Sequence, residues 1–380
     1  MQKMKSPEEL IDHALVFTKG NLKKRLPFLF QGLRIKPEHA TIKLTARCNF
    51  RCIMCGLGGG KAEGELSSQA WQEVLRQLRE IGISHIHFSG GEPLLRSDLP
   101  DLVAYAHSLK FKEIYLSTNG YLLDENMAER LISSGLNNIV ISIDALNEDF
   151  DRIRGIEGGF KKVYSACLVL SKISKTNKLK FSISLTIMQP TLKHIMEVVG
   201  LTESLGGSII FSLLDRSPIF FERSDKIGRF WIEGTDILYL NEIVDKLVEL
   251  KKIKPWLIKF NYADLAYIKK YFIDPRQKDI LCFKSLKRIF IGPEGKVYGG
   301  CWSAKPLGDV SQAGIRGIVN SSQYAAEHNR MLIKDCSGCS CGYTRDLRYA
   351  PEYILSDLYL KARYGIEKAC GRSSSDGDVS

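Results

Sequence analysis

The sequence predicts an α/β fold, in which a partial barrel of strand–helix units is followed by a smaller, cysteine-rich α+β domain. Residues 40–215 alternate short β-rich runs with longer amphipathic stretches, which is typical of parallel βαβ units. The alternation stops at about residue 255, and six of the ten cysteines follow between residues 282 and 370. A length of 380 residues also favours two domains. We therefore expect a partial (β/α)6 barrel over 40–255 and a second domain over 256–370.

The elements of the barrel follow from the apolar patterns and from helix punctuation. Strands are expected at 40–46, 85–89, 113–118, 138–144, 180–188 and 208–214. Several of the helical patterns begin at Ser or Asp and end at Gly, as helix termini do. In all, the helices of the barrel are expected at 67–82, 98–110, 124–135, 160–174 and 192–206. A further helix over 235–253 and the apolar segment Pro-Trp-Leu-Ile-Lys-Phe (255–260) are expected to lead away from the barrel.

The ends of the chain have a different character. Residues 288–301 predict a β-hairpin around Pro-Glu-Gly, which is followed by a loop region with clustered cysteines. A helix with an apolar stripe is expected at 351–366, and residues 371–380 are expected to be a disordered tail. Residues 1–39 are expected to form one or two helices as an N-terminal extension.

The composition excludes several classes of protein. The chain is 44% hydrophobic and 26% charged, with a formal net charge of +11, which is ordinary for a globular protein. No apolar run approaches the roughly 20 residues that cross a bilayer. The N-terminal stretch carries acidic residues and has no small-residue cleavage site, so a signal peptide is not expected. We therefore expect a cytoplasmic protein whose cysteines are thiols for metal binding or catalysis rather than disulfides.

Three cysteines lie close together directly after the first predicted strand. Cys48, Cys52 and Cys55 form a Cys-x3-Cys-x2-Cys motif, and thiolate ligands select iron–sulfur clusters or zinc. A structural zinc site takes four ligands, and the Gly-Leu-Gly-Gly-Gly run after Cys55 offers neither Cys nor His. A four-iron cluster held by three thiolates leaves one iron open to a small molecule. An iron–sulfur cluster is therefore favoured, with zinc as the alternative.

At this spacing the sequence resembles the radical S-adenosylmethionine (SAM) superfamily, and later segments match in the family's order. Gly90-Gly91-Glu92-Pro93 follows the second strand, where the family binds the amino group of SAM. Ser117-Thr118-Asn119-Gly120 follows the third strand, where the family contacts the ribose. Ser142 and Asp144 close the fourth strand, and a family-like Arg-Gly segment ends at Gly155. The similarity covers roughly residues 40–215 and 280–342.

The resemblance implies a set of cofactor contacts at Met54, Gly90, Gly91, Glu92, Ser117, Asn119, Ser142, Asp144 and Arg154. Met54 departs from the family, which often has an aromatic residue there, although a thioether also packs on a purine face. The residues alone support the same arrangement. All the segments follow apolar strands, and the carboxyl ends of parallel barrel strands share the rim where barrel active sites occur.

The resemblance also implies a reaction and its cofactors. The reduced [4Fe–4S] cluster passes one electron to SAM, which yields methionine and a 5′-deoxyadenosyl radical that removes hydrogen from the substrate. An electron donor such as flavodoxin or ferredoxin is implied as a partner. The chain's part is to orient the reactants and to exclude water and oxygen. No residue of this chain is assigned as a catalytic acid or base.

The C-terminal cysteines resemble the SPASM/Twitch extension of radical SAM enzymes, which holds auxiliary four-iron clusters. A full SPASM domain has a longer cysteine pattern, and six cysteines are too few for two fully ligated clusters. One auxiliary [4Fe–4S] cluster is therefore expected on Cys282, Cys301, Cys336 and Cys339. Cys341 and Cys370 are substitute ligands or belong to a second, incomplete cluster. Structural zinc is again the alternative.

The substrate class rests on analogy with the family. A peptide or protein is the first hypothesis, because many members with this extension modify peptides. A dehydrogenase or biosynthetic enzyme for a small alcohol, sugar or lipid-linked precursor is the second, and a non-catalytic iron–sulfur or zinc scaffold is the remote one. Nucleic acid is disfavoured because the basic residues are spread out and no nucleic-acid module is recognised. Contact of Lys23, Lys24 and Arg25 with an anionic membrane surface is a weak alternative to a docking helix.

Other residues are expected to have no part in the chemistry. Cys167 lies in an apolar helical stripe and is expected to be buried. His85 and His87 share one face of a strand, and packing is expected rather than metal ligation. Glu63 and Glu65 are expected to belong to a mobile part of the cysteine loop.

Overall fold

The computed structural model describes residues 36–55, 60, 63–215, 228–275, 287–301 and 305–332. Several predictions fall outside these residues: the N-terminal helices up to residue 35, the helix at 351–366 and the tail. The same holds for the predicted ligands Cys282, Cys336, Cys339, Cys341 and Cys370.

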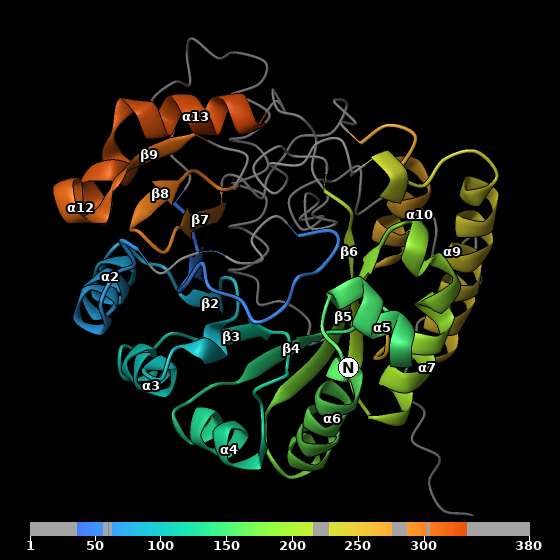
Figure 1. Cartoon of the computed structure of the whole chain (residues 1–380). Coiled ribbons are helices and arrows are strands. Elements are labelled where there is room, and N and C mark those ends of the chain that lie inside the picture. Colours follow the sequence, from blue (N-terminus) through green and yellow to red (C-terminus); the bar gives the residue numbers. More distant parts are fainter. Residues whose placement is uncertain are drawn as a thin grey trace, which may run out of the picture.

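The six strands predicted for the barrel are confirmed. They are β1 His39–Lys43, β2 His85–Ser89, β3 Glu113–Thr118, β4 Asn138–Ser142, β5 Lys180–Ile187 and β6 Ser208–Leu213. Each strand pairs in parallel with the next along the chain, so all six carboxyl ends lie at one rim. The result is a curved, partial (β/α)6 barrel with its helices around the outside (Figure 1).

The predicted barrel helices are also present. They are α2 Ser68–Glu80, α3 Leu99–Ser108, α4 Glu125–Ser133, α6 Gly159–Thr176 and α7 Ile195–Ser204. Ser67 caps α2 by accepting from the Ala70 N–H at 3.2 Å, and Asp124 caps α4 by accepting from the Met127 N–H at 2.8 Å. The connections also contain the short 3-10 helices η1 Pro93–Leu95 and η2 Gln189–His194, and the helix α5 Asn147–Arg154, which the sequence pattern did not predict.

The two faces of the barrel sheet differ in chemistry because successive side chains of a strand point to opposite faces. Ile42, Phe88 and Leu116 are fully buried on the face that packs against the helices. The inner face is rich in polar residues, namely Thr41, Lys43, His87, Tyr115, Ser117, Ser142, Ser182, Ser184, Ser208 and Ser212. The inner face is therefore suited to a ligand rather than to a closed apolar core.

Residues 288–309 extend the barrel sheet past β1. The predicted hairpin is confirmed as β7 Arg288–Ile291 and β8 Lys296–Tyr298, which pair in antiparallel fashion. β9 Pro306–Asp309 pairs with β8, while β7 pairs in parallel with β1. The sheet formed by the described residues therefore has the order β6-β5-β4-β3-β2-β1-β7-β8-β9 and continues across the domain boundary expected at 255.

The sequence predicted a loop region after the hairpin. This prediction is wrong for residues 310–332, which form the helices α12 Val310–Asn320 and α13 Ser322–Leu332. Helix α12 was not predicted because it contains Gly314 and Gly317, and glycine is a poor helix former. The helix is kinked at Gly314, whose φ is 58°. Tertiary packing compensates. Ile315 is fully buried, and its N–H donates to the side chain of Gln77 in α2 at 2.8 Å.

The chain after β6 also differs from expectation. The short 3-10 helix η4 Gly228–Phe230 is followed by α9 Asp236–Ile253, which confirms the predicted helix, and by α10 Tyr262–Tyr271. The segment between α9 and α10 was predicted to lead away from the barrel. Instead, Ile258 forms a parallel bridge with Ile209 of β6, because the apolar Leu257 and Ile258 are buried there. None of the described helices is both long and apolar enough to cross a membrane.

Candidate functional site

The cysteine loop follows β1 and is fixed by backbone hydrogen bonds to the end of α5. The Arg51 N–H donates to the Arg154 carbonyl at 3.1 Å, and the Ile53 N–H donates to the Ile153 carbonyl at 2.9 Å. Gly155 ends α5 at a φ of 61°, and a Cβ there would lie 2.4 Å from the Arg51 carbonyl oxygen. A glycine is therefore required for this close approach.

The three thiols of the loop lie within electrostatic reach of one another. Cys48 and Cys52 are half-buried and Cys55 is exposed. Burial raises the pKa of Cys48 to about 11, and the charges of Cys52 and Cys55 add to this rise. Metal binding would therefore displace protons from these thiols.

The donor set fits an iron–sulfur cluster better than a single ion. Within the described ranges, no three Cys, His, Asp or Glu side chains converge closely enough to hold one metal ion. A four-iron cluster is larger than one ion and is held by cysteine thiolates, so its ligands stand further apart. The three thiols of this loop, together with the cation of Arg154 beside Cys52, suit such a cluster.

Gly90 and Gly91 lie directly against the start of the cysteine loop. The Gly91 N–H donates to the Thr45 carbonyl at 2.7 Å, and the Glu92 N–H donates to the Arg47 carbonyl at 2.8 Å. A Cβ on Gly91 would lie 2.1 Å from the Arg47 carbonyl oxygen. The two glycines thus allow the loop after β2 to approach the backbone of the cysteine loop.

Glu92 has a structural task in this arrangement. Its side chain is fully buried, and its carboxylate accepts hydrogen bonds from the Thr118 hydroxyl at 2.6 Å and the Asn119 N–H at 2.7 Å. A third bond comes from the Leu94 N–H at 3.0 Å. Burial raises the pKa of Glu92, while these three donors oppose the rise. The carboxylate therefore ties the loop after β2 to the loop after β3.

Replacing Glu92 by Gln should lower the free energy of unfolding by about 2 kcal/mol, because the new amide NH2 must face at least one buried donor. Denaturant unfolding of the anaerobically purified protein measures the loss. Glu129→Gln is the matched control, since Glu129 is exposed on α4 and its change should stay within about 0.5 kcal/mol. Equal stability of the two variants would contradict the role of Glu92.

Asn119 joins the loop after β3 to the cysteine loop. Its Nδ2 donates to Oδ1 of Asn49 at 2.7 Å, and its Oδ1 accepts from the Tyr121 N–H at 3.0 Å. Asn49 was not among the residues predicted from the sequence. The one signal that could have indicated it is its position between Cys48 and Cys52. Three of the predicted segments therefore meet at the cysteine loop.

The segment after β4 is linked to the cysteine loop by an ion pair between Asp144 and Arg154. Asp144 follows β4 and is fully buried, and its Oδ2 lies 2.7 Å from Nη2 of Arg154. Nη1 of Arg154 lies 3.7 Å from Sγ of Cys52. The carboxylate of Asp144 and the thiol of Cys52 raise the pKa of Arg154 against the effect of burial, so the guanidinium stays charged.

Other predicted residues lie near the site in less direct ways. Met54 is half-buried and packs against the core. Ser117 Oγ lies 2.7 Å from Nε2 of His87 on the inner face, and Ser142 stands opposite Ser184 in register. Cys301 is half-buried after β8. The cysteines predicted to act with it lie outside the described residues.

One expectation about a single residue is confirmed and one is wrong. Cys167 is fully buried in α6, as expected. The ring of His85 stacks on that of His39, with the ring centroids 4.3 Å apart. Glu65 does not belong to a mobile segment. Its Oε1 accepts from the Thr45 hydroxyl and from the Ala46 N–H, both at 2.8 Å, and so closes the base of the cysteine loop.

Lys43 is an inner-face residue that sequence reasoning missed. It ends β1, five residues before Cys48, and burial lowers its pKa to about 8 against the opposing charges of Cys55 and Glu294. The alternation of β1 could have revealed it, because Ile42 and Leu44 are both fully buried on the other face.

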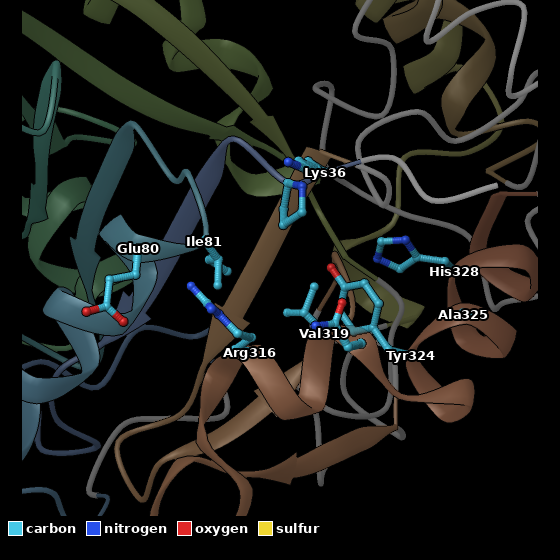
Figure 2. Close-up of a pocket in the computed structure, with 10 residues that line it drawn as sticks. Lys36, Glu80, Ile81, Arg316, Val319, Tyr324, Ala325 and His328 are labelled. Carbon is cyan, nitrogen blue, oxygen red and sulfur yellow. The ribbon is translucent and has the colours of Figure 1, made fainter. Parts of the chain in front are cut away.

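A separate cavity of about 340 Å³ lies at the other end of β1. Figure 2 shows that α12 and α13 enclose it together with the segment before β1 and the end of α2. Its lining includes Lys36, Ile81, Arg316 and Tyr324. Since Lys36 precedes β1 and the cysteines follow it, the cavity is distinct from the candidate site.

A cysteine triad and four further segments thus gather at the carboxyl ends of the strands of a parallel partial barrel. Residues 42–201 match the family model described as the radical SAM superfamily. These residues are therefore a radical SAM domain, which confirms the resemblance of the barrel segment to this superfamily. The cofactors of this superfamily are a [4Fe–4S] cluster and SAM.

Individual relatives cover part of the chain. Fe-coproporphyrin III synthase of Methanosarcina barkeri is 33% identical over 187 residues, which are 48% of this chain and 46% of the relative. The PqqA peptide cyclase of Granulibacter bethesdensis is 30% identical over 177 residues, 45% of this chain and 46% of the relative. The chain thus spans about half the length of these curated relatives.

The fold also matches solved structures. The structure of native anSMEcpe with bound AdoMet and the Cp18Cys peptide aligns with a TM-score of 0.60 at 17% identity, covering 86% of this chain and all of that chain. At this identity the match shows the fold, which agrees with the α/β class expected from the sequence.

Proposed function

We propose that this chain is a radical SAM enzyme that modifies a peptide or protein substrate. The observation that carries the proposal is the convergence of four loop segments on the cysteine loop. Gly91 and Asn119 are joined to that loop by hydrogen bonds, and Arg154 lies beside Cys52. The rim formed by the carboxyl ends of parallel barrel strands is where barrel active sites occur, and this supports a site at the cysteine loop.

In the proposed reaction, Cys48, Cys52 and Cys55 hold the cluster by three thiolates. When bound, the cluster and SAM supply the one-electron cleavage that yields a 5′-deoxyadenosyl radical for hydrogen abstraction. The chain positions the cofactor, and we propose that Gly90, Gly91 and Glu92 contact it. Met54, Ser117, Asn119, Ser142, Asp144 and Arg154 complete the proposed set of contacts.

The inner face of the barrel is the proposed substrate surface. It begins at Lys43, whose pKa of about 8 leaves it mostly protonated at neutral pH. Hydroxyls from β5 and β6 line its other side, where Oγ of the half-buried Ser184 and Oγ of the half-buried Ser212 lie 3.4 Å apart. A face rich in hydroxyl groups, with the Lys43 ammonium at its edge, suits the backbone amides and carbonyls of a peptide, which offer both donors and acceptors.

A peptide substrate is supported by the PqqA peptide cyclase and by the fold shared with anSMEcpe, whose structure holds a peptide. A small-molecule substrate is the second candidate, because the Methanosarcina relative is named for a tetrapyrrole product. We propose in addition one auxiliary [4Fe–4S] cluster on Cys282, Cys301, Cys336 and Cys339, with Cys341 and Cys370 as substitutes. An external one-electron donor such as flavodoxin or ferredoxin is part of the proposal.

The test of SAM cleavage needs no substrate. Anaerobically reconstituted protein, reduced with dithionite and given SAM, should release 5′-deoxyadenosine, and Cys52→Ala should reduce this release by at least about 100-fold, because such a cluster depends on its thiolate ligands. Cys167→Ala is the matched control and should retain the release, since Cys167 is buried in α6 away from the loop. If the wild type released no more 5′-deoxyadenosine than Cys52→Ala, the proposal that the chain is a radical SAM enzyme would be refuted.

The substrate class requires a second measurement. Peptides and small molecules encoded or made by neighbouring genes should be added in turn, and each product analysed by mass spectrometry. A mass change in a peptide supports the first candidate, whereas a change confined to a small molecule supports the second.

A further inference from the structure

The ion pair between Arg154 and Asp144 is unusual because it is almost completely buried. Arg154 is 8% exposed and Asp144 is fully buried, and their closest atoms are 2.7 Å apart. Oδ1 of Asp144 also accepts from the Thr186 N–H at 2.7 Å. Removing two charges from water costs free energy that their attraction often fails to recover. A contribution to stability is therefore a weak reason for this pair.

The other side of the guanidinium faces a predicted cluster ligand. Nη1 of Arg154 lies 3.7 Å from Sγ of Cys52, while Nη2 is held by Asp144. The backbone bonds of Arg51 and Ile53 to the end of α5 keep the loop at this distance. The planar guanidinium thus connects a carboxylate on one side with a sulfur atom on the other.

We propose that Arg154, oriented by Asp144, is a positioning residue that donates to the Cys52 sulfur and raises the reduction potential of the cluster. This inference rests on the proposed function, in which Cys48, Cys52 and Cys55 hold that cluster. Reduction moves one electron from the external donor to the cluster, which gains one negative charge while no covalent bond forms or breaks. A cation beside a ligand sulfur stabilises the reduced state more than the oxidised one, and hydrogen bonds and charge are known determinants of cluster potentials.

Asp144 has the opposite effect in this scheme. Its negative charge lies behind the guanidinium and partly cancels the field of Arg154 at the sulfur. Removing the carboxylate charge alone should therefore raise the potential. Removing both charges should lower it, because the nearer charge is the positive one. A merely structural role of the pair predicts no such reversal of sign.

The variants are Asp144→Asn and the double variant Asp144→Asn/Arg154→Met. The double variant leaves no unpaired charge in the interior, which guards against unfolding. Lys180→Met is the matched control, because it removes a cation from an exposed pair with Glu113, at the amino-terminal ends of β5 and β3. Far-UV circular dichroism and iron content should confirm that each protein is folded and loaded.

The readout is a redox titration followed by electron paramagnetic resonance, without SAM or substrate, on the signal that Cys52→Ala abolishes. At a fixed potential, the ratio of reduced to oxidised cluster should rise about threefold in Asp144→Asn. It should fall about tenfold in the double variant, a shift of about 59 mV for one electron, and stay unchanged in Lys180→Met. Equal potentials, or shifts of both variants in one direction, would overturn the inference. If wild type lacks a signal that depends on Cys52, the proposed function fails instead.

Discussion

A variant with Cys48, Cys52 and Cys55 all replaced by Ala should bind about four irons fewer than wild type and should release no 5′-deoxyadenosine. Under the proposed function, wild type holds about eight irons, four in the SAM cluster and four in one auxiliary cluster. The loss is expected to be complete because the first cluster has no other cysteine ligands. Iron and acid-labile sulfide should be counted after anaerobic reconstitution, with Cys167→Ala as the control for loss of a buried thiol.

The iron that remains in the triple variant tests the auxiliary site. About four irons support one auxiliary cluster, and about eight support two. Zinc without iron would refute an auxiliary cluster and favour a structural metal site. A further variant, Cys301→Ala in the triple background, should remove the remaining iron if Cys301 is a ligand.

Replacing Gly91 by Ala should unfold or severely weaken the site. A Cβ at this position would lie 2.1 Å from the Arg47 carbonyl oxygen and 2.9 Å from that of Ala46. Both contacts are with backbone, so the cysteine loop must move. We expect a loss of about 3 kcal/mol in the free energy of unfolding, as for severe overpacking, together with at least about tenfold weaker SAM binding. Denaturant unfolding and equilibrium binding of SAM measure the two effects.

The matched control for Gly91→Ala is Gly200→Ala. Gly200 lies in α7 with open space around its Cα, so an added methyl meets no atom within 4 Å. Alanine is a better helix former than glycine, and the control should gain up to about 1 kcal/mol. If both variants lose stability equally, close packing at Gly91 is not the cause.

Much of the barrel could be predicted because its signals are local. Apolar runs such as Ile139–Ile141 and helix caps such as Ser67 specify the secondary structure of residues only a few positions away in the sequence. Helix α5 escaped prediction since Asn147–Arg154 is mostly polar and only eight residues long. Helix α12 escaped because Gly314 and Gly317 oppose it, and packing against α2 overrides that preference.

The partners of the site residues could not be predicted in the same way. The motif around Glu92 gives no sign that its carboxylate accepts hydrogen bonds from Thr118 and Asn119. The bond between Asn49 and Asn119 joins residues 70 positions apart. Such contacts depend on how the strands curve and which loops then meet, and no local pattern records that.

The sequence by itself determined the order of the six barrel strands and of the helices α2, α3, α4, α6 and α7, the cysteine triad, and the resemblance of residues 42–201 to the radical SAM superfamily. Periodicity, capping and motif spacing are properties of neighbouring residues. Only the tertiary structure decided that β7 extends the barrel sheet beside β1 and that Arg154 lies against Cys52, 102 positions away. The physical reason is that hydrogen bonds and charges act over a few ångströms of space. Which distant residues come within that range is fixed by the closing of the barrel.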